Sequence, residues 1–322
     1  MGYKNLKPTP VYDTYWEFAV KRQNVFFARI NGEDAPWTED DIIQKYKFTN
    51  AYRASDRVSQ FLIKNVIYEK DFSPEDLCFR ILFFKLFNKV ETWKYMENCL
   101  GEIAYSSYSF DKYNKLLLER ISDCEKIYSA AYIMPSGKSC FGHERKHQNH
   151  LRLLEYMMNS EITKKVAHAK SLQELYISLL DYPTLGPFLA FQFAIDINYS
   201  ELCDFNEMSY VVAGPGAKNG IMKCFSDLGG YSYEDIIRYV AEHQEEEFHK
   251  RDLNFKSLYG RKLQLIDCQN LFCETDKYAR VAHPDICGAD NRKKIKQKYV
   301  DHNYDKLDYF YPPKWGINTL VH

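Results

Sequence analysis

The chain has 322 residues, 45% of them hydrophobic, and its 43 basic and 44 acidic side chains leave a formal net charge of −1. This composition excludes a disordered chain and excludes nucleic-acid binding through overall charge, so any such contact needs a local basic face. The nine cysteines include no CxxC pair and no apolar run could span a bilayer, so we expect a reducing compartment, cytoplasmic or in a eukaryote nuclear, and no membrane partner.

Helical periodicity recurs along the whole sequence, and no segment alternates with period two. This pattern predicts an all-α, multi-helix globular fold with about nine or ten helices. We expect a single helical domain over residues 1–322, with a boundary near residue 140 as the place where two subdomains would meet. Residues 291–322 form a basic and aromatic C-terminal extension.

The first segment with candidate binding residues runs from 48 to 68. A continuous helix there would place five polar side chains on one face, namely Asn50, Arg53, Arg57, Gln60 and Lys64. Two guanidinium groups one turn apart could grip a phosphate, since arginine presents a planar fork of donors. The alternative is a solvated face on which Asp56 partly neutralises the arginines.

A helix start follows at Ser73, where the serine side chain caps and Asp76 closes a capping box. Apolar residues then recur at helical spacing over 79–90, which predicts a core helix. The same capping chemistry marks two further helix starts, at Ser171 with Glu174 and at Ser232 with Asp235.

Residues 143–147 read HERKH and satisfy the zinc-binding pattern HExxH. On a helix, His143 and His147 would face one metal ion, with Glu144 as the base. The inner positions are Arg and Lys and no third ligand is specified, so a zinc site is kept only as an alternative and no metal is expected. The preceding loop, PSGKS, ends like a phosphate-binding loop, but Tyr132 stands where its leading glycine belongs.

Asp196 stands out in the segment from 184 to 200, where Gly186 and Pro187 begin a strongly apolar helix. A carboxylate in apolar surroundings needs a partner or a task. Two interpretations stay open: Asp196 caps or pairs structurally, or it serves as a catalytic base.

The most informative stretch is VVAGPGAKNGIMKC, residues 211–224. Gly214, Pro215 and Gly216 lie between two apolar segments, and a helix begins near Ala217. Backbone N–H groups at such a corner can approach a phosphate closely, and the helix adds the positive end of its dipole. In an all-helical protein we expect the anion to be nucleic-acid backbone.

Near the C-terminus, a predicted helix over 263–281 carries a polar stripe formed by Asp267, Asn270, Glu274 and Lys277. If the stripe is buried, a carboxylate beside an ammonium group suits acid–base catalysis; the alternative is an exposed, salt-bridged face. A basic run follows at Arg292, Lys293, Lys294, Lys296 and Lys298, with Tyr304, Tyr309, Tyr311 and Trp315 after it. Such a run suits a backbone contact in combination with the other features.

Several of these segments together resemble a known family. The segments are YWEFAVKRQNVFFARI, FTNAYRASDRVSQFLI, TLGPFLAFQFAIDI, GPGAKNGIMKCF and NLFCETDKYAR. In this order they resemble the helical domain associated with 5-hydroxymethyl-deoxyuridine DNA kinases, over about residues 12 to 300. That domain is similar to the alpha-glutamyl/putrescinyl thymine pyrophosphorylases, and the group looks like a relative of helix-hairpin-helix DNA glycosylases.

The resemblance implies an all-α fold and a role in thymine hypermodification, in which hydroxymethyluracil in DNA is phosphorylated and the phosphate is replaced by an amine. The kinase activity belongs to a P-loop domain that is not found in this sequence, so we do not expect the chain to be the kinase. In the glycosylase comparison, Lys218 falls where bifunctional enzymes carry their Schiff-base lysine. The aspartate usual some way downstream is matched only by Asp235, which the capping box already explains.

We therefore expect a DNA-acting enzyme that flips out a modified pyrimidine and performs group transfer or excision on it, with no cofactor. The residues assigned to DNA backbone and phosphate are Asn50, Arg53, Arg57, Gln60, Gly214, Pro215 and Gly216. Those assigned to proton transfer and charge stabilisation are Asp196, Lys218, Glu274 and Lys277. The alternatives are a non-catalytic DNA-binding module that serves a separate P-loop DNA kinase, and a zinc-dependent hydrolase.

Overall fold

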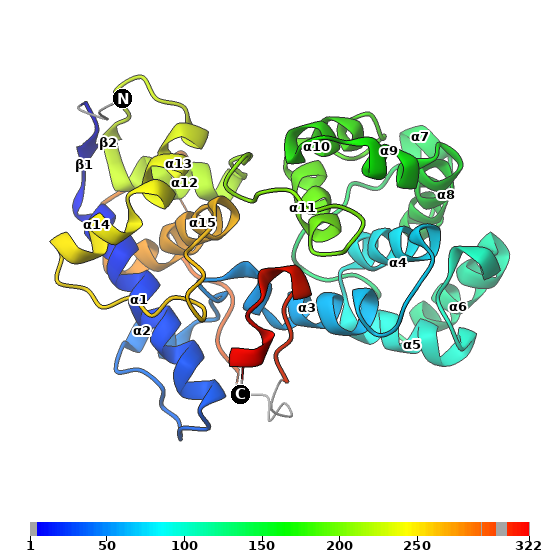
Figure 1. Cartoon of the computed structure of the whole chain (residues 1–322), viewed down its shortest axis with the longest axis horizontal. Coiled ribbons are helices and arrows are strands. Elements are labelled where there is room, and N and C mark those ends of the chain that lie inside the picture. The colour runs from blue at the N-terminus through cyan, green and yellow to red at the C-terminus, as the bar shows by residue number, and fades with distance from the viewer. Residues whose placement is uncertain (1–4, 291, 301–307, 322) are drawn as a thin grey trace. The chain divides into compact units, whose positions relative to one another are not determined.

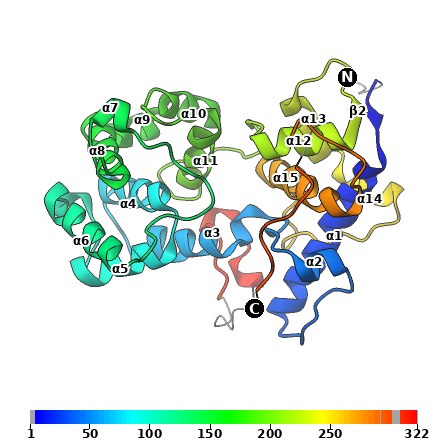
Figure 2. The same cartoon turned by 180° about the vertical axis from the view of Figure 1, so that it is seen from behind.

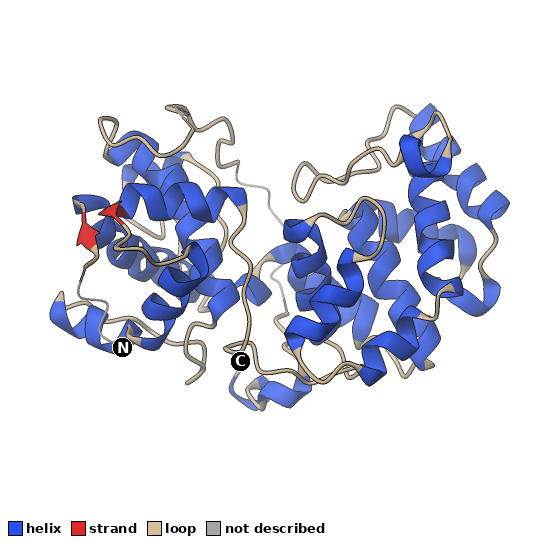
Figure 3. Cartoon of the chain, turned by 90° about the horizontal axis from the view of Figure 1, so that it is seen from above, coloured by secondary structure: helices blue, strands red, loops and turns tan. Residues whose placement is uncertain are grey.

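A computed structural model describes residues 5–290, 292–300 and 308–321. Across these residues the regular structure is almost all helical (Figure 3). The exception is a pair of short antiparallel strands, β1 (Lys7–Pro8) and β2 (Phe225–Asp227). The predicted all-α fold is confirmed.

The chain divides into two compact units, and each takes residues from separate parts of the sequence. The first unit takes residues up to 56, 210–309 and those from 319 on, and the second takes residues 57–209 and 310–318. Residue 140, the expected boundary, falls inside the second unit. Helices α6 (Phe110–Ser122) and α8 (Lys146–Asn159), which lie on either side of that position in sequence, pack against each other.

In the first unit, three helices form the core: α1 (Pro10–Ile30), α12 (Pro215–Cys224) and α15 (Leu265–Ala282). Figures 1 and 2 show α12 lying along α15. The rings of Tyr15 and Phe272 meet between α1 and α15 with centroids 4.5 Å apart. The remaining helices of this unit are α2 (Asp41–Lys45), η1 (Arg53–Ser55), α13 (Tyr233–Glu242) and α14 (Gln244–Lys250).

The second unit is built around α4 (Pro74–Phe87), whose residues from Leu77 to its end are all buried. Ser73 caps this helix by accepting from the Asp76 amide at 3.1 Å, so the predicted helix start and core helix are confirmed. The predicted capping box is not formed, because the Asp76 carboxylate accepts from the Ser73 hydroxyl and the Ser106 amide. The other helices of the unit are α3 (Arg57–Phe61), η2 (Leu62–Ile67), α5 (Val90–Leu100), η3 (Tyr105–Ser107), α6, α7 (Lys138–Phe141), α8, α9 (Ile162–His168), α10 (Leu172–Leu180), α11 (Pro187–Asn198) and η4 (Pro313–Trp315).

The single helix expected over residues 48–68 is wrong. The 3₁₀ turn η1 ends at Asp56, whose backbone is extended, and the chain then forms the short helix α3 and the π-helix η2. The cause is local: the Asp56 carboxylate accepts the amide of Asn50 at 2.7 Å and closes a loop in place of a helix. The five polar residues therefore do not share one helical face.

The helix starts at Ser171 and Ser232 are confirmed, and the second forms a full capping box with Asp235. All nine cysteines lie in the described part of the chain, and they form no disulfide. Within the described residues, no helix is long and apolar enough to cross a membrane.

Candidate functional site

The glycine corner at residues 214–216 begins helix α12, with Gly214 as the N-cap and Pro215 in the first turn. Much of its glycine content serves helix packing. A Cβ on Gly216 would lie 2.3 Å from the Cys273 sulfur, and one on Gly220 would lie 2.0 Å from the carbonyl oxygen of Phe272. These glycines let α12 approach α15 closely and hold the start of α12 beside the turn of α15 that carries Glu274.

The same corner keeps an accessible end. Pro215 and Lys218 are exposed, and the Lys218 ammonium lies 5.5 Å from the centre of the Tyr233 ring. One amide just before the helix, that of Ala213, already donates to the Glu234 carboxylate at 2.8 Å. The start of α12 therefore has one of its nearby donors occupied by a carboxylate, while the cationic side chain of Lys218 faces solvent.

Helix α15 carries the predicted polar stripe. Glu274 accepts from the Lys277 ammonium at 2.8 Å, which confirms that a carboxylate and an ammonium lie side by side. The same carboxylate accepts the Thr49 amide at 3.0 Å. Asp267, in the first turn of α15, accepts the Arg53 amide at 2.8 Å. Two acids of α15 thus hold the loop of residues 49–56 through its main chain.

That loop places further charges against α15. The Asn50 side chain donates to the carbonyl oxygen of Ser55 at 2.7 Å, which fixes the loop from within. Arg53 is only 2% exposed. Of the residues assigned to phosphate from the sequence, the structure thus brings Asn50 and Arg53 next to the predicted acid–base pair of α15.

Two residues that the sequence analysis missed complete this arrangement, Arg22 of α1 and Asp56. Arg22 is 7% exposed, and its Nη1 is buried without a hydrogen-bond partner. The charges of Asp56 and Glu274 both favour its protonated form, whereas burial lowers its pKa. We call Arg22, Asn50, Arg53, Asp56 and Glu274 the Arg22–Asp56 cluster.

The electrostatics of Asp56 are those of a proton-transfer group. Burial raises the pKa of Asp56 to about 7, and the negative charge of Glu274 adds to this rise. The Asn50 amide and the guanidinium groups of Arg22 and Arg53 oppose it. A carboxyl group with a pKa near neutrality can accept or donate a proton under physiological conditions, and a buried guanidinium with an unsatisfied donor can receive an oxyanion.

A sequence signal for both residues exists. Arg22 follows Tyr15 and Phe18 on the buried face of α1 and precedes Phe26 at the same helical spacing, so it is a charge on an apolar stripe. Asp56 lies between Arg53 and Arg57, and an acid between two arginines indicates from sequence alone only a neutralising charge.

In the second unit, Asp196 forms a buried ion pair. Its carboxylate lies 2.7 Å from the Lys85 ammonium, and the two side chains are 2% and 1% exposed. Lys85 also lies over the Tyr132 ring, 4.0 Å from its centre. This geometry corresponds to the structural alternative for Asp196.

Arg57 and Gln60 also belong to the second unit. Arg57 pairs with Glu91 at 3.6 Å, and the Gln60 side chain accepts the Phe310 amide at 2.8 Å. Gln60 is 3% exposed, so a direct contact with a ligand requires a local opening there.

The HExxH pattern does not lie on one helix, so the alternative of a zinc site on a helical face is wrong. Helix α8 begins at Lys146, so His143 and Glu144 precede it and do not share a helical face with His147. Glu144 pairs with Lys138 at 2.7 Å, and His147 bonds to Asn114 at 2.9 Å. The described residues contain no group of three or more His, Cys, Asp or Glu side chains that could hold a metal ion.

The basic run is exposed at Arg292 and Lys296, while Ile295 between them is buried. Arg292 pairs with Asp290, and Lys298 lies opposite Tyr46 in an isolated antiparallel bridge. Tyr304, assigned to the same surface, lies outside the described residues.

With this geometry in hand, the comparisons with known proteins identify the family. A family model described as the helical domain of 5-hmdU DNA kinase matches residues 9–288. The chain belongs to this family. A curated relative, the 5-hmdU DNA kinase of Bacillus phage SP10, is 27% identical over 288 residues, which cover 83% of this chain and 45% of that protein. The chain thus spans less than half the length of the relative.

No solved structure matches the chain. The resemblance to helix-hairpin-helix glycosylases is therefore not confirmed, and residues 199–214 form turns and irregular chain where that motif would place a helix directly before the corner. The match to the 5-hmdU DNA kinase helical domain includes every member of the Arg22–Asp56 cluster and the whole of α12 and α15. The basic run at 292–298 lies beyond it.

Proposed function

We propose that this chain is an enzyme that acts on DNA containing modified hydroxymethyluracil, with the Arg22–Asp56 cluster as its chemical centre. The observation that carries the proposal is the buried guanidinium of Arg22, whose Nη1 has no hydrogen-bond partner, beside a carboxyl group whose pKa is about 7. Membership of the 5-hmdU DNA kinase helical family supports DNA as the substrate. A modified pyrimidine flips out of the stack to reach such a centre. Because Arg22 and Arg53 are only 7% and 2% exposed, a local opening admits the base.

The reaction is group transfer at the exocyclic methylene carbon of phosphorylated hydroxymethyluracil. An amine nitrogen forms a bond to this carbon as the bond from carbon to the phosphate oxygen breaks, so the phosphate leaves with the bonding electrons. Asp56, in its ionised form, accepts the proton that the amine loses. Arg22 and Arg53 stabilise the charge of the departing phosphate, and Glu274 with Lys277 holds the loop that carries Asp56.

The start of α12 binds the DNA backbone next to this centre. Gly214 is its N-cap, Pro215 and Gly216 lie in its first turn, and the exposed Lys218 supplies a cation that neutralises a phosphate. Because Gly216 contacts Cys273, the residue before Glu274, a strand held at this corner passes close to the cluster. No cofactor takes part in this proposal.

The test uses a duplex that contains one phosphorylated hydroxymethyluracil, a primary amine and the full chain, with products identified by nucleoside mass spectrometry. We expect amine-substituted pyrimidine from the native protein and a loss of about 10²- to 10⁴-fold in turnover for Asp56→Asn. Asp285→Asn, an exposed carboxylate of the same unit, is the control and should retain turnover. Free base in place of the substituted nucleoside would assign excision instead, and full activity of Asp56→Asn would remove Asp56 from the mechanism.

A second candidate is a non-catalytic DNA-binding module that presents substrate to a separate kinase. It is favoured by the curated relative, which is named a DNA kinase and is more than twice as long as the matched region. It predicts DNA affinity without a product on any modified duplex, tolerance of Glu274→Gln, and faster phosphorylation of hydroxymethyluracil DNA when the chain is added to a P-loop DNA kinase.

A further inference from the structure

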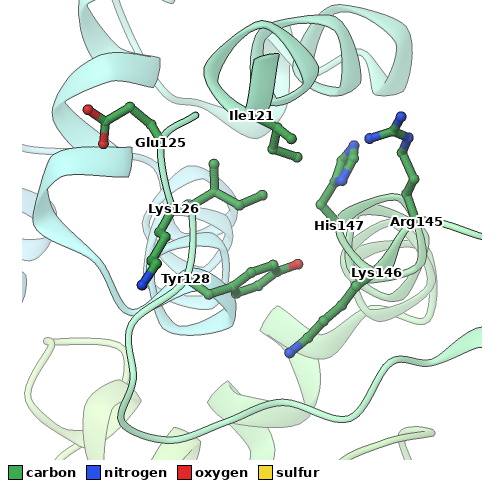
Figure 4. A pocket seen from close by; sticks show the side chains of 8 residues that line it. Ile121, Glu125, Lys126, Tyr128, Arg145, Lys146 and His147 are labelled. Atoms are coloured by element: carbon green, nitrogen blue, oxygen red, sulfur yellow. The ribbon is translucent and has the colours of Figure 1, made fainter. Parts of the chain in front are cut away.

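A hollow of about 470 Å³ lies in the second unit between the end of α6 and the start of α8 (Figure 4). Ile121, Ile127 and Tyr128 give it an apolar wall. Its size and its mixture of apolar wall and a few polar groups are those of small-molecule sites. None of the residues that form the Arg22–Asp56 cluster lines it.

Three cationic side chains border this hollow: Lys126, Arg145 and Lys146. Within the described part of the chain, none of the three forms an ion pair. The carboxylate at the rim, Glu125, lies 3.6 Å from Arg120 and is neutralised by it. The hollow therefore carries a local excess of positive charge in a protein whose overall charge is near zero.

The polar groups around the hollow are held in place. The Tyr128 hydroxyl bonds to Nδ1 of His150 at 2.8 Å, and its ring stacks on Phe87 with centroids 5.0 Å apart. Lys146 lies over the same ring at 4.5 Å. Burial lowers the pKa of His147 to about 4, so this side chain is a neutral wall at physiological pH. A site built in this way needs little reorganisation to bind.

The start of α8 adds to the positive potential. Arg145 is its N-cap but provides no side-chain cap, and Lys146 and His147 form the first turn. Figure 4 shows the side chains of Lys126 and Lys146 on one side of Tyr128 and that of Arg145 on the other, next to His147. An anion in the hollow is thus attracted both by the helix dipole and by cations.

We infer that this hollow binds a nucleoside monophosphate unit, with the phosphate at Lys126 and Lys146 and the sugar and base against Ile121 and Tyr128. The charge requires an anion, and the apolar wall requires that the anion carry a less polar body. Such a unit has two sources, a free nucleotide or a nucleotide within a DNA strand. The inference does not depend on the proposed function, because it concerns other residues.

The test is calorimetric titration of the full chain with dTMP, thymidine and inorganic phosphate. We expect saturable binding of dTMP. Thymidine lacks the phosphate group and inorganic phosphate lacks the sugar and base, so each should bind at least about tenfold more weakly. The double variant Lys126→Gln/Lys146→Gln should weaken dTMP binding by at least about tenfold. Lys112→Gln, an exposed lysine of α6 that does not line the hollow, is the matched control and should bind as the native chain does.

A thymidine tetranucleotide separates the two sources. Tighter binding than dTMP assigns the hollow to a DNA strand, and equal or weaker binding assigns it to a free nucleotide. The inference is overturned if neither ligand binds saturably, or if the double variant keeps its native melting temperature and binds unchanged. If that variant does not fold, Lys126→Gln replaces it, since this exposed residue lies outside any helix and its loss should still weaken dTMP binding.

Discussion

Two buried clusters of charge, one in each unit, differ in how fully their groups are satisfied. In the second unit, Lys85 and Asp196 meet at 2.7 Å and each neutralises the other. In the first unit, Arg22 has a buried donor without a partner, and the pKa of Asp56 is raised to about 7. Both clusters are built from acid and base in an apolar core.

The difference teaches that buried charge alone does not mark a site. A closed pair such as Lys85 with Asp196 satisfies its own charges and leaves nothing for a ligand. An incompletely satisfied cluster is costly unless function requires it, so the Arg22–Asp56 cluster is the better candidate for a site. Each of the following changes tests one side of this contrast.

The largest expected effect comes from opening the closed pair. Lys85→Met removes the cation that pairs with the buried Asp196 carboxylate, and we expect the free energy of unfolding to fall by about 3–5 kcal/mol in urea denaturation. Lys138 with Glu144 forms a pair of the same 2.7 Å length at the surface, with side chains 55% and 82% exposed. Lys138→Met is the control, with an expected loss below about 1 kcal/mol. Equal losses would show that burial is not what distinguishes the two pairs.

The next effect concerns the helix contact that places α12 beside the open cluster. Gly220→Ala puts a methyl group against the carbonyl oxygen of Phe272, and we expect a loss of about 1–3 kcal/mol, measured in the same way. Gly186→Ala is the matched control, because nothing lies within 4 Å of a Cβ at that position and its backbone is extended. A stability of Gly220→Ala equal to that of the control would contradict the close packing of α12 on α15.

A smaller effect should appear in the pH dependence of stability. The pKa of Asp56 is about 7 in the folded chain, above its ordinary value of 3.8, so the folded state holds the proton more strongly. This stabilising contribution is complete below about pH 4 and is lost as the pH rises through about 7. In the native chain we expect the free energy of unfolding to fall by roughly 1–2 kcal/mol between pH 5 and 8, a figure reduced for the water that reaches this half-buried group. Asp56→Asn has no carboxyl group to titrate at this position, so this fall should be absent from the variant. An unchanged pH profile would place the titration elsewhere.

The smallest change in stability is expected for Arg22→Met. Its guanidinium is buried and incompletely hydrogen-bonded, so its replacement by an apolar side chain should alter the free energy of unfolding by less than about 1 kcal/mol or increase it. The same variant should lose turnover in the nucleoside assay, which is the signature of a residue retained for function. A loss comparable with that of Lys85→Met would mean that Arg22 is as fully paired as Lys85.

The features that the sequence predicted correctly depend on short-range geometry. The Ser73 and Ser232 caps act within one helical turn, and Glu274 meets Lys277 because residues three apart on a helix are neighbours. The all-α fold follows from the same periodicity.

The features that the sequence did not predict depend on which elements meet. Arg22 comes from α1 and Asp56 from a loop, and nothing local shows that Glu274 of α15 lies near both. A glycine pattern does not tell whether another helix or a phosphate takes the space that a side chain would occupy. At Gly216 and Gly220 this space is taken by α15. The helix expected through residue 56 failed because one carboxylate bonded back to Asn50, a choice that propensity does not register.

The interrupted course of the first unit has a consequence for biosynthesis. Helices α1 and α15 form one core although residues 57–209 of the second unit separate them along the sequence. On the ribosome, α1 emerges long before α15 is translated and keeps its apolar face uncovered during that interval. The residues of the second unit up to 209 emerge in one uninterrupted stretch, so that body can condense first, and the nascent α1 is then the part of the chain that most needs chaperone protection.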